Sequence, residues 1–186
     1  VYAVATLLGQ DKIETLGVLS NLQSVAGRFQ YLKVSGGPTT IVDYAHTPDA
    51  LKNVLETIKA VKQTDSRLIT VIGCGGDRDK EKRPIMAAIA SDMSEQLILT
   101  SDNPRTEAPS AILNDMQKGL DDEQLNNAFV MEDRKEAIKL AVKLANESDV
   151  ILIAGKGHEK YQEIDGVRYD FDDYEIASEF TNQMTP

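Results

Sequence analysis

The chain has 186 residues, with 20 Lys or Arg against 30 Asp or Glu, and a formal net charge of −10 at pH 7. This acidic balance argues against nucleic acid as the main partner, because a phosphate-binding surface needs clustered positive charge. A single cysteine, Cys74, excludes an internal disulfide and fits a cytoplasmic location, and no apolar run approaches the roughly 18 residues that a membrane span needs.

Residues 1–25 predict one or two short helices, interrupted by Gly9 and Gly17. Because this helical pattern starts at once and no initiator Met precedes it, we expect the chain to be a fragment of a longer polypeptide. Two strands are predicted next, over residues 28–34 and 39–44. The short turn between them contains two glycines and a proline, which favours an antiparallel hairpin.

Helices and strands then alternate along the chain. The strands are nearly continuous apolar runs, which is typical of strands that helices cover on both faces of a parallel sheet. We therefore predict an α/β fold, a three-layer Rossmann-like sandwich with a mostly parallel sheet and an antiparallel edge hairpin. A further hairpin is predicted around the Asp165-Gly166 turn. The predicted helices cover residues 49–62, 84–93, 109–120, 134–146 and 173–183, and the predicted strands cover residues 67–72, 96–100, 127–131 and 150–154.

Polar or glycine-rich loops follow the carboxyl ends of five predicted strands. In open parallel sheets, ligands bind beyond these ends, so we expect the loops to converge on one crevice. In contrast, the charged side chains of residues 52–62 and 134–143 are interpreted as solvated helix faces with no function. The five loops comprise residues 43–46, 73–79, 101–105, 132–134 and 155–159.

The loop with Asp102, Asn103, Pro104 and Arg105 is the most informative of the five. Proline delays the start of the next helix, which keeps the polar side chains in the loop. Arg offers a planar fork for a carboxylate, and Asp offers a counter-charge for an ammonium group. The cluster can therefore bind a ligand that carries both groups. The alternative is an ordinary helix start with a solvated Arg.

The glycine-rich loop at residues 73–76 matches neither the G-x-G-x-x-G pattern nor the Walker A pattern, which is absent from all 186 residues. We expect its glycines to let the backbone approach a ligand and to point Arg78 into the crevice. Cys74 as a nucleophile has only His46 and His158 as possible bases, and a free cysteine at a strand end is more often a packing residue. No catalytic residue is assigned in this chain.

Three further residues are candidates for small-molecule contacts. Lys156 can bind an anion, and Glu159 can bind an amine. Asp43 can bind ribose hydroxyls, because a carboxylate accepts from two of them. The alternative is that Asp43 and His46 only cap the following helix. The two histidines show no metal-ligand spacing, so no metal site is predicted.

Together these motifs resemble the C-terminal domain of the Mur ligase family. The resemblance covers about residues 26 to 175, with the motifs in family order. It implies that residues 26–186 form the amino-acid-binding C-terminal domain and that residues 1–25 are the C-terminal tail of a central ATPase domain. The stretches that carry it are residues 27–29, 42–51, 73–79, 82–84, 101–105, 154–159 and 161–162.

The resemblance implies an ATP-dependent acid–amino-acid ligase of peptidoglycan synthesis. It is strongest to the members that add meso-diaminopimelate to UDP-MurNAc-L-Ala-D-Glu through an acyl phosphate. The implied cofactors are ATP and Mg²⁺ in the complete enzyme, with none tightly bound to this fragment. The implied partners are diaminopimelate, ATP, the UDP-muramoyl dipeptide and the enzyme's own central and N-terminal domains, without nucleic acid or membrane. Because the phosphate loop is absent here, we expect the fragment alone to be inactive.

The resemblance also assigns the candidate residues. Lysine lacks the distal carboxylate of diaminopimelate and would leave an Arg fork unpaired, and such sites reject the poorer analogue by factors of order 10⁴. Two alternatives remain: a folylpolyglutamate-synthase-like ligase domain, and a non-catalytic module that binds a zwitterionic amino acid. The implied diaminopimelate-binding residues are Arg78, Asp102, Asn103, Pro104, Arg105, Gly155 and Glu159, and the implied ATP-binding residues are Arg28, Asp43 and His46.

Overall fold

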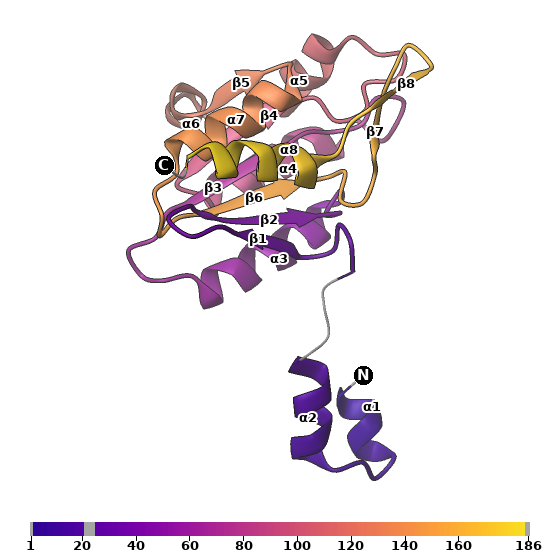
Figure 1. The fold of residues 1–186 in the computed structure, drawn as a ribbon. Helices are drawn as coiled ribbons and strands as arrows, with labels where there is room; N and C mark the ends of the chain where they lie inside the picture. The colour runs from indigo at the N-terminus through magenta and orange to yellow at the C-terminus, as the bar shows by residue number, and fades with distance from the viewer. Residues whose placement is uncertain (1, 21–24, 185–186) are drawn as a thin grey trace.

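The computed structural model describes residues 2–20 and 25–184. Within them, a six-stranded sheet lies between two layers of helices, with strand order β1-β2-β6-β3-β4-β5 (Figure 1). β1 runs antiparallel to β2, and the other neighbouring strands are parallel, so the predicted fold class is confirmed. The strands are β1 (Gln30–Lys33), β2 (Thr39–Asp43), β3 (Leu68–Ile72), β4 (Gln96–Thr100), β5 (Phe129–Met131) and β6 (Val150–Ala154).

The central strands β3 and β6 are buried at every position, as their apolar sequences predict. Their registers bring the carboxyl ends of the strands level with one another. Ala154 pairs with both Asp43 and Ile72, and Ile72 pairs with Leu99. The loops that follow β2, β3, β4 and β6 therefore begin at one edge of the sheet.

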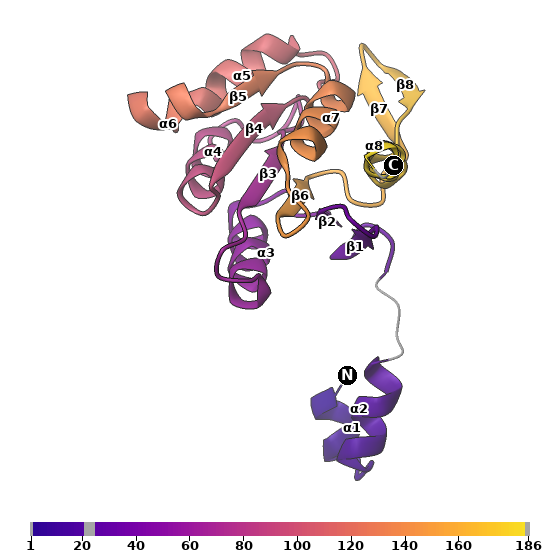
Figure 2. The ribbon, with the colours of Figure 1, turned by 60° about the vertical axis from the view of Figure 1, so that its left-hand side comes forward.

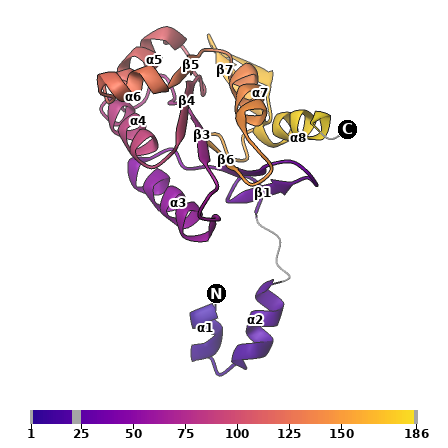
Figure 3. The same cartoon turned by 90° about the vertical axis from the view of Figure 1, so that its left-hand side faces the viewer.

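Helices cover both faces of the sheet (Figure 3). In the helix at residues 48–61, Leu51, Leu55 and Ile58 recur at helical spacing and are fully buried. Burial of each side chain stabilises the fold by about 1.5–3 kcal/mol. Helices α3 (Pro48–Val61), α4 (Lys82–Asp92) and α5 (Pro109–Gln117) pack on one face, and α7 (Arg134–Leu144) and α8 (Asp173–Gln183) pack on the other.

One helix differs from the sequence prediction. α6 (Asp122–Asn127) was not predicted, although a capping box marks its start: Asp121 accepts from the backbone of Gln124, and the Gln124 side chain accepts from Asp121 N–H. Because α6 continues to Asn127, strand β5 begins at Phe129 rather than at residue 127.

The predicted second hairpin is confirmed and lies beside the carboxyl edge of the sheet. β7 (Tyr161–Ile164) and β8 (Val167–Asp170) are joined by Asp165 and Gly166, which both have positive φ, as a tight hairpin turn requires. Arg105 forms an isolated parallel bridge with Ile164, which connects this hairpin to the loop after β4.

The two short N-terminal helices, α1 (Tyr2–Leu7) and α2 (Lys12–Ser20), stand apart from the sheet (Figures 1 and 2). Their apolar side chains, including Leu7 and Ile13, are exposed. Short helices with an uncovered apolar face are marginally stable alone. The assignment of residues 1–25 to another domain stays a prediction, and residues 1 and 21–24 lie outside the described residues. None of the helices in the described residues is both long and apolar enough to cross a membrane.

Candidate functional site

A cavity of about 520 Å³ opens at the carboxyl edge of the sheet, where the loops after β2, β3, β4 and β6 meet. Seven of the sequence-predicted residues line it, together with Tyr44, Thr47, Gly75, Asp79, Lys82 and Tyr161. Pro104, Arg28 and Asp43 do not line it. The seven are His46, Arg78, Asp102, Asn103, Arg105, Gly155 and Glu159.

Asp102 is the most unusual group in the cavity. Its side chain is buried, with the residue 8% exposed, yet its carboxylate makes no hydrogen bond or salt bridge with residues 2–20 or 25–184. Burial raises the pKa of this carboxyl, and the positive charges of Arg134 and Lys156 only partly oppose that shift. Buried polar groups normally have partners, so an unpartnered carboxylate in a cavity favours a cationic ligand.

Gly155 leaves space for the Asp102 carboxylate. Its φ is +115°, and a Cβ added there would lie 2.7 Å from Asp102 Oδ2. A side chain at this position would be strained and would also crowd the acid. The glycine predicted as a binding residue therefore acts at least by keeping Asp102 accessible.

Asn103 is held in a single amide orientation beneath the cavity. Its Oδ1 accepts from Lys156 Nζ at 2.8 Å and from Glu163 N at 3.0 Å, while its Nδ2 donates to Glu159 Oε2 at 2.7 Å. Lys156 is fully buried, and burial lowers its pKa. The expectation that Lys156 binds an anion is therefore wrong for this conformation, because its ammonium group is enclosed by protein partners.

Arg105 adopts a backbone conformation that is unusual for a non-glycine residue, with φ of +53°. The β7–β8 hairpin stabilises it, since Arg105 N donates to Glu163 O and Asp165 N donates to Arg105 O. Its Nη1 donates to Gly76 O at 2.7 Å, and its Nε and Nη2 have no acceptor among the described residues. The guanidinium is thus anchored on one side and available to a ligand on the other.

The loop after β3 places Arg78 on the rim, where it is exposed and donates to Asp77 O. Gly75 of this loop lines the cavity, whereas Gly76 has a different role from the one predicted. A Cβ on Gly76 would lie 1.9 Å from Pro104 O, so this glycine permits close contact with the loop after β4 rather than with a ligand.

An ion-pair cluster supports the same two loops. Glu107 accepts from Asp77 N and from Arg83, which is fully buried. Hydrogen bonds from Arg83 and then Lys80 lower the pKa of Glu107 to about 2.

Of the three predicted nucleotide-binding residues, His46 lines the cavity, while Arg28 and Asp43 lie beside its lining residue Tyr44. Asp43 Oδ2 accepts from Phe29 N at 2.7 Å, which leaves its other oxygen free of partners among the described residues. The exposed Arg28 guanidinium lies 5.9 Å from the centre of the Tyr44 ring. His46 is exposed, with Nδ1 2.8 Å from Tyr44 O. Neither Asp43 nor His46 caps α3, because Thr47 accepts from Ala50 N instead.

The remaining reactive candidate, Cys74, is a packing residue. It is buried, its Sγ lies 3.9 Å from Met86 Sδ, and burial raises its pKa to about 12. A thiol with that pKa supplies almost no thiolate near neutral pH. Within residues 2–20 and 25–184, no group of three or more His, Cys, Asp or Glu side chains could hold a metal ion.

Arg134 corrects the interpretation of residues 134–143 as a solvated face. Its side chain is fully buried and pairs with the fully buried Asp173 through two 2.8 Å hydrogen bonds. The only sequence signal was an arginine three residues after the end of a predicted strand, and Asp173 lies 39 residues further along the chain.

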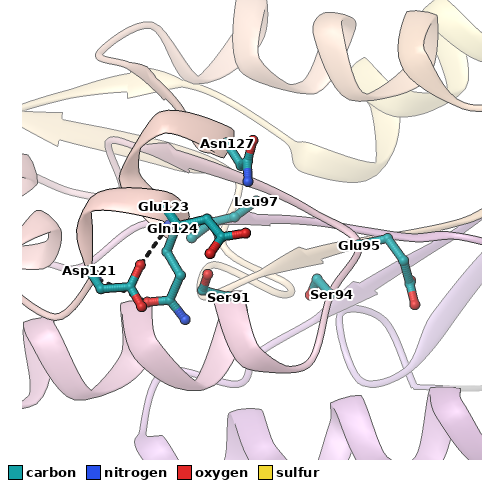
Figure 4. A pocket seen from close by; sticks show the side chains of 8 residues that line it. All are labelled: Ser91, Ser94, Glu95, Leu97, Asp121, Glu123, Gln124 and Asn127. Atoms are coloured by element: carbon teal, nitrogen blue, oxygen red, sulfur yellow. Dashed lines mark hydrogen bonds between the residues drawn. The ribbon is translucent and has the colours of Figure 1, made fainter.

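A second hollow, of about 330 Å³, lies at the opposite edge of the sheet (Figure 4). Asp121 and Gln124 bond each other there, Ser94 bonds Thr70, and Glu95 accepts from Leu68 N. This hollow is polar, but Glu95 and Asp121 already have protein partners, and its third acid, Glu123, is exposed. It is therefore a weaker candidate than the cavity around Asp102.

The chain is similar to several known proteins. The family model "Mur ligase, glutamate ligase domain" matches residues 27–157. A UDP-N-acetylmuramoyl-L-alanyl-D-glutamate–2,6-diaminopimelate ligase of Cytophaga hutchinsonii is 54% identical over 184 residues, which is 99% of this chain and 38% of that protein. A solved structure of a ligase with the same description superposes with a TM-score of 0.80 at 41% identity, covering 100% of this chain and 37% of that one. Escherichia coli FolC in complex with ADP is more distant, with a TM-score of 0.53 and 26% identity over 72% of this chain and 29% of that one. The chain thus spans little more than a third of the length of the two diaminopimelate ligases, at 38% and 37%.

Proposed function

Because the chain belongs to the Mur ligase family, we propose that it is the amino-acid-binding domain of a cytoplasmic, ATP-dependent ligase that adds meso-diaminopimelate to UDP-MurNAc-L-Ala-D-Glu. The description of the relative that is 54% identical supports this substrate pair. In this proposal, residues 26–186 form the C-terminal domain, and residues 1–25 belong to a central ATPase domain. The observation that carries it is the buried, unpartnered Asp102 carboxylate in one cavity with the Arg105 guanidinium.

The cavity suits the distal zwitterionic end of the diamino acid. The free Nε and Nη2 of Arg105 would pair with its carboxylate as a planar fork, with Arg78 approaching from the rim. The Asp102 carboxylate and the free Oε1 of Glu159 would accept from its ammonium group. Asn103 and Pro104 would act mainly by shaping the loop, since both side chains are buried among protein groups.

In the proposed reaction, this chain binds the amino acid, and another domain of the complete enzyme carries the phosphate loop. ATP would phosphorylate the glutamate carboxylate, and the amine of diaminopimelate would attack the acyl phosphate and displace phosphate. This chain would fix the distal end of the amino acid, so that the reacting amine is presented in one direction. Arg28 and the free oxygen of Asp43 offer a cation and an acceptor for the nucleotide, with His46 nearby. Without a phosphate loop, the 186 residues alone are expected to bind but not to ligate.

Two alternatives make different predictions. A folylpolyglutamate-synthase-like domain would prefer glutamate, and the lower structural similarity to FolC makes it the weaker candidate. A non-catalytic module would bind the amino acid, but the complete protein would form no amide. Glutamate has no second ammonium group to neutralise Asp102, which also disfavours the first alternative.

Titration calorimetry on the chain tests the proposal. We expect meso-diaminopimelate to bind, and lysine and glutamate to bind at least about 100-fold more weakly, because each leaves a buried charged group unpaired. Arg105→Ala should remove the preference over lysine. The control Arg67→Ala, at the opposite edge of the sheet, should retain it. Tighter binding of lysine or glutamate would refute the assignment, and amide formation by the complete protein would exclude the non-catalytic module.

A further inference from the structure

One buried arginine connects the strand ends that carry Asp102 and Gly155. Arg134 Nη1 donates to Ser101 O at 3.2 Å, and its Nη2 donates to Ala154 O at 3.1 Å. Ser101 directly precedes Asp102, and Ala154 directly precedes Gly155. The two strands, β4 and β6, are not neighbours, because β3 lies between them. The guanidinium therefore bridges two loops that the hydrogen bonds of the sheet do not connect directly.

Asp173 fixes the orientation of this bridge. Both of its carboxylate oxygens accept from the guanidinium at 2.8 Å, which is the planar two-bond geometry of a strong Arg–carboxylate pair. Asp173 is the first residue of α8, where the helix N-terminus favours a negative charge, and Asp172 caps that helix. The bridge thus has a rigid support on the side away from the cavity.

The positive charge of Arg134 also favours the ionised form of the Asp102 carboxylate. The other charged or titratable groups that interact with Asp102 are Lys156, Glu159, Asp173, Tyr44 and Cys74. Arg134 and Lys156 oppose the rise in the Asp102 pKa that burial causes, whereas Glu159 and Asp173 add to it. Arg134 does not line the cavity and its side chain is fully buried, so a ligand cannot touch it.

We propose that Arg134 is a positioning residue of the amino-acid site, which fixes Asp102 relative to Gly155 and places a positive charge behind the Asp102 carboxylate. The identity of the ligand rests on the function proposed above, whereas the link between Arg134 and Asp102 does not. Loss of the bridge should weaken binding of the amino acid far more than binding of the nucleotide, because Arg134 bonds the residues that precede Asp102 and Gly155 and bonds neither Arg28 nor Asp43.

Steady-state kinetics of the complete ligase test the positioning role. Arg134→Lys retains a charge but loses the two-bond geometry. We expect its KM for diaminopimelate to rise at least about tenfold, since a displacement of about 1 Å can cost a hundredfold, while its KM for ATP stays within about twofold. The matched control is Arg67→Lys, whose arginine pairs with Asp149 at the opposite edge and should leave both constants within about twofold. Equal increases in both constants, or lost thermal stability with unchanged KM, would overturn the proposal.

A carboxyl NMR titration of Asp102 in the ligand-free chain gives a readout that does not depend on the substrate. Arg134→Lys should move the Asp102 midpoint to higher pH, because the positive charge retreats. If that variant does not fold, Asp173→Asn should move the midpoint to lower pH, because it removes a facing negative charge. An unchanged midpoint would overturn the inference whichever amino acid the ligase uses. A wild-type ligase that rejects diaminopimelate would instead refute the proposed function.

Discussion

The two edges of the sheet use the same kinds of residue in different ways. At the amino edge, Arg67 pairs with the buried Asp149, which also accepts from Asn146 N–H. At the carboxyl edge, Arg134 pairs with Asp173 in a similar manner, but Asp102 beside them has no hydrogen-bonding partner among the described residues. The buried acid Asp149 at the amino edge is therefore paired, while the buried acid Asp102 at the carboxyl edge is not.

The presence of an unpaired buried acid identifies the functional edge of the sheet better than the number of polar side chains does. Both edges carry acids, amides and a hollow (Figure 4). Among the described residues, a buried carboxylate lacks a partner only at the carboxyl edge. Leaving such a group unpaired costs free energy that a ligand can recover. The following predictions test whether the two edges differ in this respect.

The largest expected effect is on stability, and it compares the two Arg–Asp pairs. Arg134→Met leaves Asp173 buried without a partner and should cost about 3–5 kcal/mol of unfolding free energy. Arg67→Met should cost only about 1 kcal/mol, because Asp149 keeps two backbone N–H donors. Urea unfolding of both variants measures the two costs. Equal losses of unfolding free energy in the two variants would show that the deeper burial of the Arg134–Asp173 pair has no energetic consequence.

Asp102→Asn should separate binding from stability. Loss of the charge should weaken binding of the diamino acid by at least about 30-fold, or about 2 kcal/mol. The same variant should unfold at a higher temperature at pH 7, since the raised pKa of Asp102 means that its ionised form destabilises the folded state. Below the ordinary pKa of an Asp, where folded and unfolded states are both protonated, this gain should vanish. Calorimetry measures the loss of affinity, and thermal melts at pH 7 and pH 3 measure the change in unfolding temperature. A lower unfolding temperature of the variant at pH 7 would contradict the assignment of an unpaired charge to Asp102.

Glu107 should make the carboxyl edge sensitive to acid. Its folded-state pKa is lowered from 4.5 to about 2, so its stabilising contribution is complete above about pH 4.5 and is lost as the pH falls toward 2. Glu107→Gln should therefore lower stability at neutral pH and flatten the acid dependence over that interval. Acid titrations followed by circular dichroism compare the variant with the wild type. If the acid-unfolding curves of the variant and the wild type run parallel, the Arg83–Glu107 ion pair is not the source of the acid sensitivity.

The smallest effect is expected at the amino edge. Asp121→Ala removes the N-cap of α6 and should cost about 1 kcal/mol. Binding of the diamino acid should not change, because Asp121 lines the other hollow. Calorimetry at a temperature where the variant is folded provides the measurement. A clear loss of affinity would mean that the two edges are energetically coupled.

Local patterns predicted most of the fold and much of the site. The apolar runs of β3, β4 and β6 indicated a covered parallel sheet, and loop composition placed Asp102, Arg105 and Glu159 at its carboxyl edge. The short helix α6 was missed because six residues carry little periodic signal. The buried state of Lys156 was also missed, since a lysine between two glycines has the composition of an exposed loop.

The sequence by itself determined which elements form, in what order, and which polar loops follow them, because these features depend on neighbours a few residues apart. Tertiary structure alone decided which polar groups keep a partner. Arg134 pairs with Asp173, which lies 39 residues away in the sequence, and Asn103 bonds Lys156, which lies 53 residues away. The Asp102 carboxylate has no hydrogen-bonding partner among the described residues. Pairing and desolvation depend on distances of a few ångströms between distant segments, and no local pattern encodes them.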